Sequence, residues 1–422
     1  MSEMSYLEKL LDGVEVEWKT LGEVAKYVRG LIYSKSSESA DGQGYKVLRA
    51  NNITLSNNCL NLNDVKVVRF DTKVKSSQKL YKNDILISAA SGSREHVGKV
   101  AYIESDIDYY FGGFMGVVRC DEKLNPRYLF HVLTSDIFQK YLDEMLNSST
   151  INNLNSAVMG RFKIPLPCPD TPEKSLAIQS EIVRILDKFT ALTAELTAEL
   201  NMRKKQYNYY RDQLLTFKEG EVEWKALGEI GEVRMCKRIL KSQTSSEGEI
   251  PFYKIGTFGK EPDSYISRKL FNEFKEKYSY PKVGEVLISA SGTIGRTVIF
   301  DGRESYFQDS NIVWIENNEK IVLNKYLFYF YKIAKWGISE GGTIKRLYND
   351  NLRKLMIPVP FPDSPERSLV EQQKIVKLLD KFDALTNSIT EGLPREIELR
   401  QKQYEYYRDL LFSFPKPETV SN

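Results

Sequence analysis

The sequence predicts an α+β fold built from two similar halves, each a mixed α/β block followed by a long helix. Three observations predict it: internal repetition, apolar residues at helical spacing, and short β-rich runs between turn residues. EVEWKTLGEV from Glu15 returns as EVEWKALGEI from Glu221, and RKKQYNYYRDQLLTF from Arg203 returns as RQKQYEYYRDLLFSF from Arg400. A period of roughly 200 residues is too long for a solenoid. We therefore expect one module present twice.

The repeats divide the chain into segments. Motif YLEKLL near the N-terminus resembles the end of the first helical segment, so both termini are expected beside the second helix, as in a pseudo-twofold ring cut open. The expected segments are an N-terminal segment completing the distal helical region (1–13), a first variable block (14–165), a central helical spacer (166–220), a second variable block (221–358) and a C-terminal helical region (359–422).

The two variable blocks carry strand and turn signals. Apolar runs such as Ile85-Leu-Ile and Val286-Leu-Ile are bounded by Gly, Asn, Asp and Ser, a pattern typical of short strands. Short helices are expected near Arg127–Leu146 and Lys325–Trp336. Each block is therefore predicted to be mixed α and β, and the blocks diverge where the helical segments agree.

The first helical segment runs from about Pro172 to Phe217, and its apolar residues alternate four and three apart. This spacing is typical of a coiled-coil seam, and the helix would span roughly 70 Å. A TAEL unit occurs at Thr193 and again at Thr197. One TAEL unit adds about 6 Å to the length of the helix and rotates its end by one turn plus roughly 40°. We therefore expect the number of units to set the length of the helix. The alternative is that the repetition arose by chance.

The second helical segment, from about Pro365 to Phe414, repeats the seam and is the expected antiparallel partner of the first. Between its conserved ends it has ten residues, Thr390–Leu399, where the first segment has six, Thr197–Met202, and the ten include Gly392 and Pro394. Four extra residues are a stutter that unwinds a coil, and a Gly-Leu-Pro sequence kinks or breaks a helix.

The composition excludes several classes of protein. Lys and Arg number 60 against 57 Asp and Glu, a net charge of +3, so only local basic patches can serve nucleic acid. The four cysteines lack CxxC spacing, so neither a metal site nor a disulfide framework is expected. No signal peptide and no run of about 18 apolar residues is apparent. We expect a cytoplasmic protein.

Catalytic motifs are weak. Asn125-Pro-Arg-Tyr128 faintly matches an adenine-methyltransferase motif, but the second copy lacks the proline, so a helix start is the preferred interpretation. Asp263 with Glu273 and Lys275 fits a loose nuclease spacing that the first copy does not share. We therefore predict a recognition protein that is not an enzyme.

Candidate DNA-binding residues lie in two matched features. LISAASGSREHVGK from Leu86 and LISASGTIGR from Leu287 each run from a strand into a small-residue loop whose N–H groups could form an anion-binding nest. The second feature is Ser149-Thr-Ile-Asn-Asn against Gly342-Thr-Ile-Lys-Arg. A plain hairpin and a structural junction remain alternatives. The predicted DNA-binding residues, including weaker ones at early strand ends, are Arg49, Asn51, Asn52, Arg94, Lys99, Asn152, Asn153, Lys254, Thr293, Arg296, Lys345 and Arg346.

Taken together, the variable blocks, conserved helices, TAEL repeats and RKKQYNYYRD-type motifs make the whole chain resemble the specificity subunit of type I restriction–modification systems, in particular the type IC branch. The resemblance implies that each block reads one half of a split DNA sequence and that the helices set the gap. It also implies two modification subunits that use S-adenosylmethionine, and two restriction subunits that use ATP and Mg²⁺. The chain itself would hold no cofactor or metal. The alternatives are a self-contained nuclease or methyltransferase, and a coiled-coil scaffold for proteins.

Overall fold

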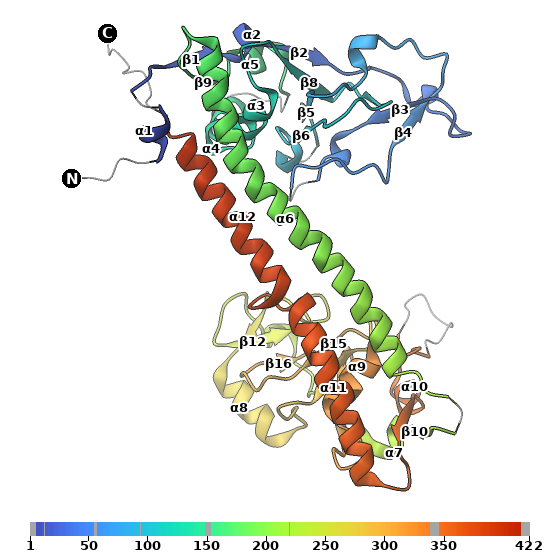
Figure 1. The fold of residues 1–422 in the computed structure, drawn as a ribbon. Coiled ribbons are helices and arrows are strands. Elements are labelled where there is room, and N and C mark those ends of the chain that lie inside the picture. The colour runs from blue at the N-terminus through green and yellow to red at the C-terminus, as the bar shows by residue number, and fades with distance from the viewer. Residues whose placement is uncertain are drawn as a thin grey trace, which may run out of the picture. The chain divides into compact units, whose positions relative to one another are not determined.

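The computed structural model describes residues 6–11, 13–54, 57–92, 94–147, 153–218, 220–337 and 346–414, with residues 6–8 and Asn147 described by their backbone alone. The chain forms two compact units (Figure 1). Unit 1 comprises Met1–Leu196 together with Ile397–Asn422, and unit 2 comprises Thr197–Glu396. The chain thus leaves unit 1, builds unit 2 and returns to unit 1. We call residues 16–167 head 1 and residues 222–360 head 2.

Head 1 contains three small sheets with strand orders β1-β9, β2-β8-β5-β6 and β4-β3-β7. Within the last sheet β3 pairs parallel with β7, and the other pairings are antiparallel. The strands are β1 (Val16–Thr20), β2 (Ala25–Arg29), β3 (Tyr45–Leu48), β4 (Lys66–Val68), β5 (Ile85–Ser88), β6 (Val100–Tyr102), β7 (Tyr110–Phe111), β8 (Met115–Cys120) and β9 (Lys163–Pro167).

Short helices and 3-10 turns connect these strands, α1 precedes them, and α3 packs on the four-stranded sheet. Asn125 begins α3 as its N-cap, with its side chain accepting bonds from the N–H groups of Arg127 and Tyr128, which confirms the helix start preferred from the sequence. The helices are α1 (Tyr6–Leu11), α2 (Leu21–Val24), α3 (Pro126–Leu133), α4 (Asp136–Asn147) and α5 (Ser156–Arg161), and the 3-10 turns are η1 (Lys35–Ser37), η2 (Ala50–Asn52), η3 (Ser76–Gln78) and η4 (Arg94–His96).

Head 2 repeats the same three strand orders, as β10-β18, β11-β17-β14-β15 and β13-β12-β16. Its strands are β10 (Val222–Ala226), β11 (Gly231–Arg234), β12 (Ile250–Tyr253), β13 (Tyr265–Ile266), β14 (Val286–Ser289), β15 (Thr297–Ile299), β16 (Tyr306–Phe307), β17 (Ile312–Asn317) and β18 (Met356–Pro360). Its helices and turn are α7 (Leu227–Ile230), η5 (Lys241–Gln243), α8 (Arg268–Lys277), α9 (Asn324–Tyr331) and α10 (Asn349–Arg353). The predicted α+β class is confirmed.

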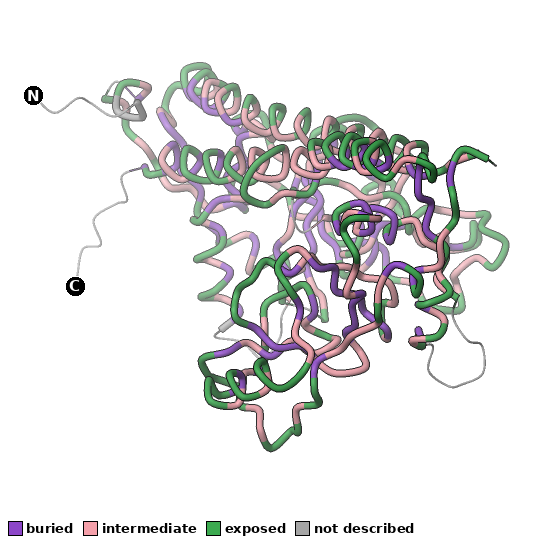
Figure 2. The backbone as a smooth tube through the Cα atoms, turned by 90° about the horizontal axis from the view of Figure 1, so that it is seen from below, coloured by how far each residue is buried: buried purple, intermediate pink, exposed green. Residues whose placement is uncertain are grey.

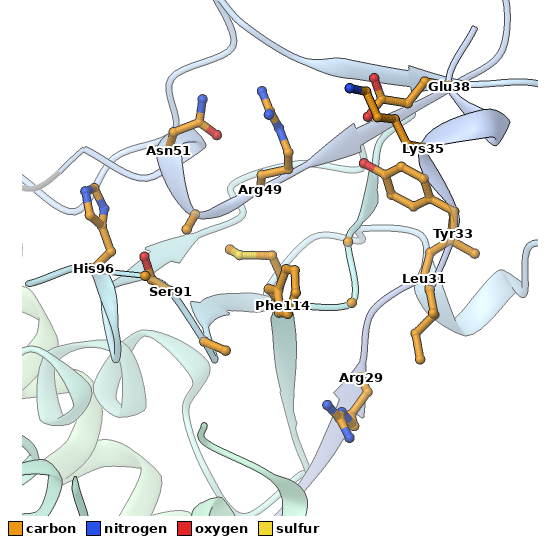
Figure 3. A pocket seen from close by; sticks show the side chains of 17 residues that line it. Arg29, Leu31, Tyr33, Lys35, Glu38, Arg49, Asn51, Ser91, His96 and Phe114 are labelled. Atoms are coloured by element: carbon orange, nitrogen blue, oxygen red, sulfur yellow. The ribbon is translucent and has the colours of Figure 1, made fainter. Parts of the chain in front are cut away.

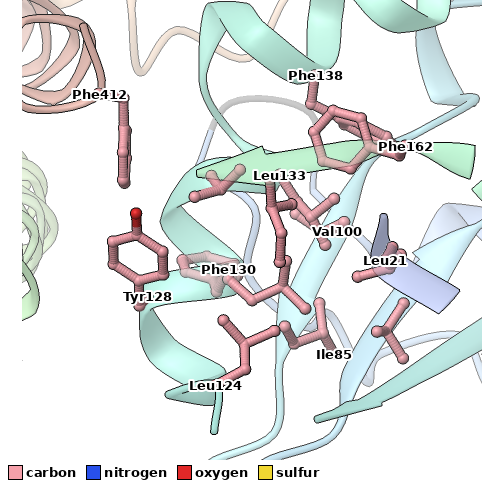
Figure 4. Packing of buried hydrophobic residues seen from close by; sticks show 14 of the residues in the cluster. Leu21, Ile85, Val100, Leu124, Tyr128, Phe130, Leu133, Phe138, Phe162 and Phe412 are labelled. Carbon is pink, nitrogen blue, oxygen red and sulfur yellow. The ribbon is translucent and has the colours of Figure 1, made fainter. Parts of the chain in front are cut away.

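In each four-stranded sheet one inner strand, β5 in head 1 and β14 in head 2, is buried on both faces, which explains its unbroken apolar sequence. We call it the central strand. Ile85 and Ile87 of β5 point into the core shared with α3, whereas Leu86 points into a second core with Val117. Side chains alternate between the faces of a strand, so one four-residue run fills both cores. Figure 4 shows residues of the first core, and in Figure 2 the long helices alternate between buried, intermediate and exposed positions along their length.

The long helix α6 (Pro172–Leu214) contributes to both units. In unit 1 its first half shares a hydrophobic core with α12 (Gly392–Leu411), and Phe189 stacks on Tyr407 at 5.3 Å. In unit 2 its second half shares a core with α11 (Pro365–Asn387), and Tyr210 stacks on Phe382 at 5.6 Å. Each unit therefore contains one helix pair drawn from the two repeated segments, as the matching seams predicted.

The second helical segment consists of two helices, α11 and α12. It is interrupted between α11 and α12. Gly392 adopts a φ of +75°, and a Cβ atom there would stand 2.4 Å from the carbonyl oxygen of Ala384. Only glycine accepts such a position without strain. The predicted break at the Gly-Leu-Pro sequence is therefore confirmed.

Described residues near the two ends of the chain share a core in unit 1. Leu11 lies in the same hydrophobic core as Leu411, Phe412 and Phe414. Phe412 packs edge-on against Tyr128 with ring centroids 5.4 Å apart (Figure 4). The N-terminal segment thus shares a core with the end of the second helical segment, as the YLEKLL motif indicated.

A buried glutamine fastens each head to its helix in the same way. The side-chain oxygen of Gln179 accepts from the N–H of Asn125 at 2.8 Å, and its amide nitrogen donates to the carbonyl of Lys123. In unit 2 Gln372 accepts from the N–H of Leu323 at 2.9 Å and donates to the carbonyl of Ile321. Both glutamines are fully buried, so each satisfies backbone groups that would otherwise lack partners.

The polar groups beside these glutamines differ between the units. In unit 1 the buried His131 places Nε2 2.8 Å from Asp187 and Nδ1 2.9 Å from the Tyr404 hydroxyl, and Arg127 also pairs with Asp187. In unit 2 the position of His131 is taken by Tyr329, whose hydroxyl donates to Asp380 at 2.7 Å. The same carboxylate position thus faces a titratable imidazole in one unit and a phenol in the other.

Candidate nucleic-acid interface

The two features matched in the sequence lie against each other in both heads. In head 1 Ala90 pairs with Asn153, and the N–H of Leu154 donates to the carbonyl of Ala89 at 2.7 Å. In head 2 Ser291 pairs with Arg346, and the N–H of Leu347 donates to the carbonyl of Ala290 at 2.8 Å. Each head therefore joins the small-residue loop after its central strand to the segment before its last short helix.

The small-residue loops are hairpins closed by glycine. Gly98 and Gly295 both have a φ of +81°, and their N–H groups donate to the carbonyls of Ser88 and Ser289. The N–H groups of Ala89 and Ala290 are also used, because they donate to carbonyls on the neighbouring strand connection. These four amides are therefore not available to an anion. The nest expected from the Ser and Gly residues of the loops stays a prediction.

A pocket of about 740 Å³ in head 1 gathers several of the predicted residues (Figure 3). Arg49 and Asn51 follow β3, the loop Ser91–Gly92 follows β5, and Phe114 precedes β8. The lining also includes cationic and polar side chains, namely Arg29, Tyr33, Lys35, Glu38 and His96. The pocket thus has the mixture of cationic, amide and apolar groups that recognises base edges and phosphates.

Asn52 is a structural residue, which corrects its prediction as a DNA contact. It is only 1% exposed. Its oxygen accepts from the N–H of Arg49, and its amide donates to the carbonyls of Asn61 and Asp64. It fixes the turn that presents Arg49 and Asn51. These two share the Asp64 carboxylate at 3.0 and 3.1 Å.

The remaining candidates of head 1 lie around the same loops. Arg94 is exposed and pairs with Asp143 at 2.7 Å, a surface ion pair that a phosphate can replace at little loss. Lys99 is half-buried at the end of the hairpin, and Asn153 is half-buried at the bridge to Ala90. Asn152 lies outside the described residues.

Head 2 presents its candidates on the equivalent elements. Lys254 follows β12 as Arg49 follows β3, and it pairs with Asp263 at 2.9 Å. Thr293 is exposed on the hairpin. Arg296 donates to the carbonyl of Phe258, and Arg346 donates to that of Ser310 at 2.7 Å. Lys345 lies outside the described residues.

The nuclease spacing does not form a site. Asp263 pairs with Lys254, and Glu273 pairs with Lys277 at 3.1 Å. Lys275 lies instead over the Phe271 ring, 5.3 Å from its centroid. Among the described residues no group of three or more His, Cys, Asp or Glu side chains is arranged to hold a metal ion.

Sequence reasoning missed the exposed apolar side chains at this surface. Phe114 is 73% exposed and Ile32 is 83% exposed, and both line the pocket. Each stands beside a buried apolar residue, Met115 after Phe114 and Leu31 before Ile32, so neither side chain looks exposed in the sequence. The FGGF sequence was the available signal, since two glycines beside a strand mark a turn.

The fold and the paired loop clusters define a protein with two copies of one recognition domain. A family model, the type I restriction modification DNA specificity domain, matches residues 13–203 and again residues 219–399. The chain therefore belongs to the type I restriction–modification DNA specificity family. The resemblance found in the sequence is confirmed, and so is the function it implies, that of a specificity subunit with two recognition domains.

Related proteins match over nearly their whole length. A Haemophilus influenzae chain named as a candidate type I restriction enzyme specificity subunit is 49% identical, over 97% of this chain and 98% of that one. A type I restriction enzyme specificity subunit of Escherichia coli is 41% identical over 100% of both. A further Escherichia coli specificity subunit is 35% identical over 93% of each.

Two solved structures share the fold at 16% sequence identity. A chain of a type I R-M system, from work on complex assembly and conformational transition, has a TM-score of 0.55 and covers 94% of this chain and 97% of its own. The crystal structure of a type I restriction–modification S subunit from M. genitalium has a TM-score of 0.51, with 98% and 100% covered. In the described part of this chain, no helix has the length and hydropathy of a membrane span.

Proposed function

We propose that this chain reads a split DNA sequence for a restriction–modification complex, with each head contacting one half-site. The observation that carries the proposal is that both heads place different side chains on the same backbone frame. The strand orders are identical, and the same two loops are bridged, yet Asn153 of head 1 stands where head 2 has Arg346. A conserved frame with changed tip residues suits two readers of different sequences.

Charge supports the same interface. Head 1 places Arg29, Lys35 and Arg49 around its pocket, with Glu38 as the opposing carboxylate, and Glu38 is already paired with Lys66 at 2.7 Å. Phosphate contacts supply much of the affinity for DNA and steer docking. The small net charge of +3 fits a subunit whose partners share these contacts.

We propose that α6 sets the gap between half-sites. The division between the two units falls between Leu196 and Thr197, where the first TAEL unit ends and the second begins. Adding one unit lengthens the helix by about 6 Å, against 3.4 Å per base pair of DNA. Both TAEL units are helical, which supports transmission of this change along a rigid element.

The test is insertion or deletion of one TAEL unit in the assembled methyltransferase, followed by mapping of methylated sites in genomic DNA. We expect both half-site sequences to stay the same and the gap to change by about one to two base pairs. Exchange of residues 14–165 for another head should change one half-site only. A changed half-site sequence in the TAEL variant would contradict the proposal.

We propose that the repeated helical motifs dock two copies of the modification subunit. Each motif presents an exposed tyrosine pair, Tyr209 with Tyr210 and Tyr406 with Tyr407, whose ring centroids are 5.4 and 5.3 Å apart. Tyr210 and Tyr407 also pack between helices, so Tyr209 and Tyr406 are the outer members. Exposed aromatic residues are typical anchors of protein interfaces.

The docking proposal is tested by Tyr209→Ala and Tyr406→Ala, singly and together, with Lys188→Ala on exposed α6 surface as the control. Each single variant should weaken binding of one modification subunit by roughly tenfold or more, and the double variant should affect both. Stoichiometry measured by native mass spectrometry or light scattering reports this. Unchanged assembly of the double variant would exclude these residues as anchors.

We further propose that the chemistry resides in the partners, which would use S-adenosylmethionine, ATP and Mg²⁺, in the cytoplasm. The rival function, a self-contained nuclease or methyltransferase, is tested with the purified chain and DNA containing mapped sites. We expect neither cleavage nor methylation until a modification subunit is added. Methylation or cleavage by the chain alone would favour the rival.

A further inference from the structure

Two positions at the tip of each head can be equated from the backbone. Phe114 directly precedes β8 and its carbonyl accepts from the N–H of Ala89 at 2.9 Å. Asn311 directly precedes β17 and its carbonyl accepts from the N–H of Ala290 at 2.8 Å. Their side chains therefore start from the same place on the same frame.

The second position follows the first strand of the four-stranded sheet. Ile32 lies three residues before η1, and Arg238 lies three residues before η5. Ile32 also lies against the turn before Phe114, because a Cβ atom added to Gly113 would stand 3.1 Å from its Cγ1. Head 1 thus has two large apolar side chains where head 2 has an amide and a guanidinium.

In head 1 these apolar side chains are exposed beside polar groups. Phe114 lies in the pocket between the side of Ser91 and His96 and the side of Leu31 and Tyr33, with Arg49 across from it (Figure 3). Within the described residues, Nε of Arg49 and Nδ1 of His96 are buried without a hydrogen-bond partner. Exposed apolar groups and unpaired polar atoms at one pocket mark a surface completed by a ligand.

In head 2 the equivalent groups are tied into polar contacts. Arg238 pairs with Asp309 at 2.9 Å, and the Oδ1 of Asn311 accepts from the Ser291 hydroxyl at 2.8 Å. Arg346 donates to the carbonyl of Ser310, which lies between Asp309 and Asn311 in the sequence. This tip offers hydrogen bonds to base edges and offers no comparable apolar contact from these positions.

We propose that Phe114, supported by Ile32, contacts the C5 methyl group of a thymine in the half-site read by head 1. This inference rests on the proposed function, because it assumes that the tip faces the major groove. The thymine methyl is the apolar group on the major-groove edge of the base pairs, and phenylalanine is a side chain suited to it. The cations Arg29 and Arg49 on the same pocket favour DNA over an apolar protein surface. The exposed Asn51 on this rim suits adenine, the pairing partner of thymine.

The test uses the assembled methyltransferase and duplexes carrying its mapped site. Each thymine of both half-sites is replaced in turn by deoxyuridine, which lacks only the methyl group. We expect one thymine whose replacement weakens binding about fourfold, the amount expected for one buried methyl group. Phe114→Ala should weaken binding to the thymine duplex by a similar factor or more and should abolish the further loss caused by deoxyuridine, as two changes to one contact are not additive.

Asn311→Ala in head 2 is the matched control, and it should keep the full sensitivity to deoxyuridine at that position. Phe114 is exposed, so its replacement should leave the unfolding midpoint unchanged. The inference is overturned if no thymine is sensitive, if the half-sites contain none, or if Phe114→Ala retains the deoxyuridine effect. Failure of the wild-type complex to methylate any defined sequence would instead overturn the proposed function.

Discussion

Unit 1 and unit 2 share the strand orders of their heads, the closing glycines and the buried glutamines, and they differ at the tips of the heads and at one buried polar cluster. Gly98 matches Gly295 and Gln179 matches Gln372, each with the same backbone bonds. The tips differ by Phe114 against Asn311. The comparison teaches that the residues shared by both units hold the backbone in place. The residues that differ either face solvent or change the titratable groups of a buried cluster. Substitutions in the two sets should therefore affect stability differently.

The largest effect should come from the closing glycines. A Cβ atom at Gly295 would stand 2.1 Å from Nε1 of Trp336, in addition to the strain of a φ of +81°. Gly295→Ala should therefore destabilise unit 2 by about 2–4 kcal/mol. Gly256→Ala is the control, because a Cβ atom there meets nothing within 4 Å.

Denaturant unfolding followed by tryptophan fluorescence measures this, because Trp224, Trp314 and Trp336 all lie in head 2. Gly98→Ala should destabilise unit 1 instead, where the added atom would stand 2.2 Å from a flexible methyl of Leu142. A smaller loss at Gly98 than at Gly295 would sharpen the comparison, since a leucine moves aside more easily than an indole. If neither alanine variant loses measurable stability, the two closing glycines do not hold the backbone as proposed.

An intermediate effect should follow removal of either buried glutamine. Gln179→Ala and Gln372→Ala each leave a buried N–H and a buried carbonyl without their partner. Each should cost about 2 kcal/mol, and the two losses should agree because the bonds are the same. Gln373→Ala, at the exposed neighbouring position, should change stability by less than about 0.5 kcal/mol. Clearly unequal losses would show that the heads are not fastened alike.

The smallest effect is a pH dependence confined to unit 1. Burial lowers the pKa of His131 below its usual 6.5, and this outweighs the raising effect of Asp187, which also pairs with Arg127. The other groups facing the ring are Tyr404 and the cation of Arg408. Since the folded unit binds fewer protons than the unfolded chain, its stability is full above about pH 6.5 and falls as the pH drops below it, by at most about 1.4 kcal/mol per pH unit.

Unfolding at pH 7.5 and 5.5 measures this slope, and His131→Gln should reduce it. Unit 2 supplies the control, because burial raises the pKa of the equivalent Tyr329 and keeps that phenol neutral throughout. Tyr329→Phe should therefore lower stability by a similar amount at both pH values. An undiminished slope in His131→Gln would assign the pH dependence to groups outside this cluster, because the pKa of Asp187 lies below 3.8 and its carboxylate stays ionised between pH 5.5 and 7.5.

The sequence predicted which loops form the candidate site, but it predicted few of the roles of their side chains. The matched hairpins and the matched segments before the last helix were found from repetition alone, and the structure joins them at Ala90 and Ser291. Asn52 was taken for a contact, although its buried amide fixes a turn. Sequence shows that an amide is present, but its burial depends on what the turn packs against.

The sequence by itself determined the duplication, the α+β class, the helix seams and the break at Gly392, because periodicity, repetition and glycine are local properties of the chain. Only the tertiary structure decided that Phe114 and Ile32 are exposed, that His131 meets Asp187 and Tyr404, and that the amides of Ala89 and Ala290 are already used. These depend on which residues distant in sequence come together. Burial and hydrogen-bond partners are set by that packing, and no local pattern specifies it.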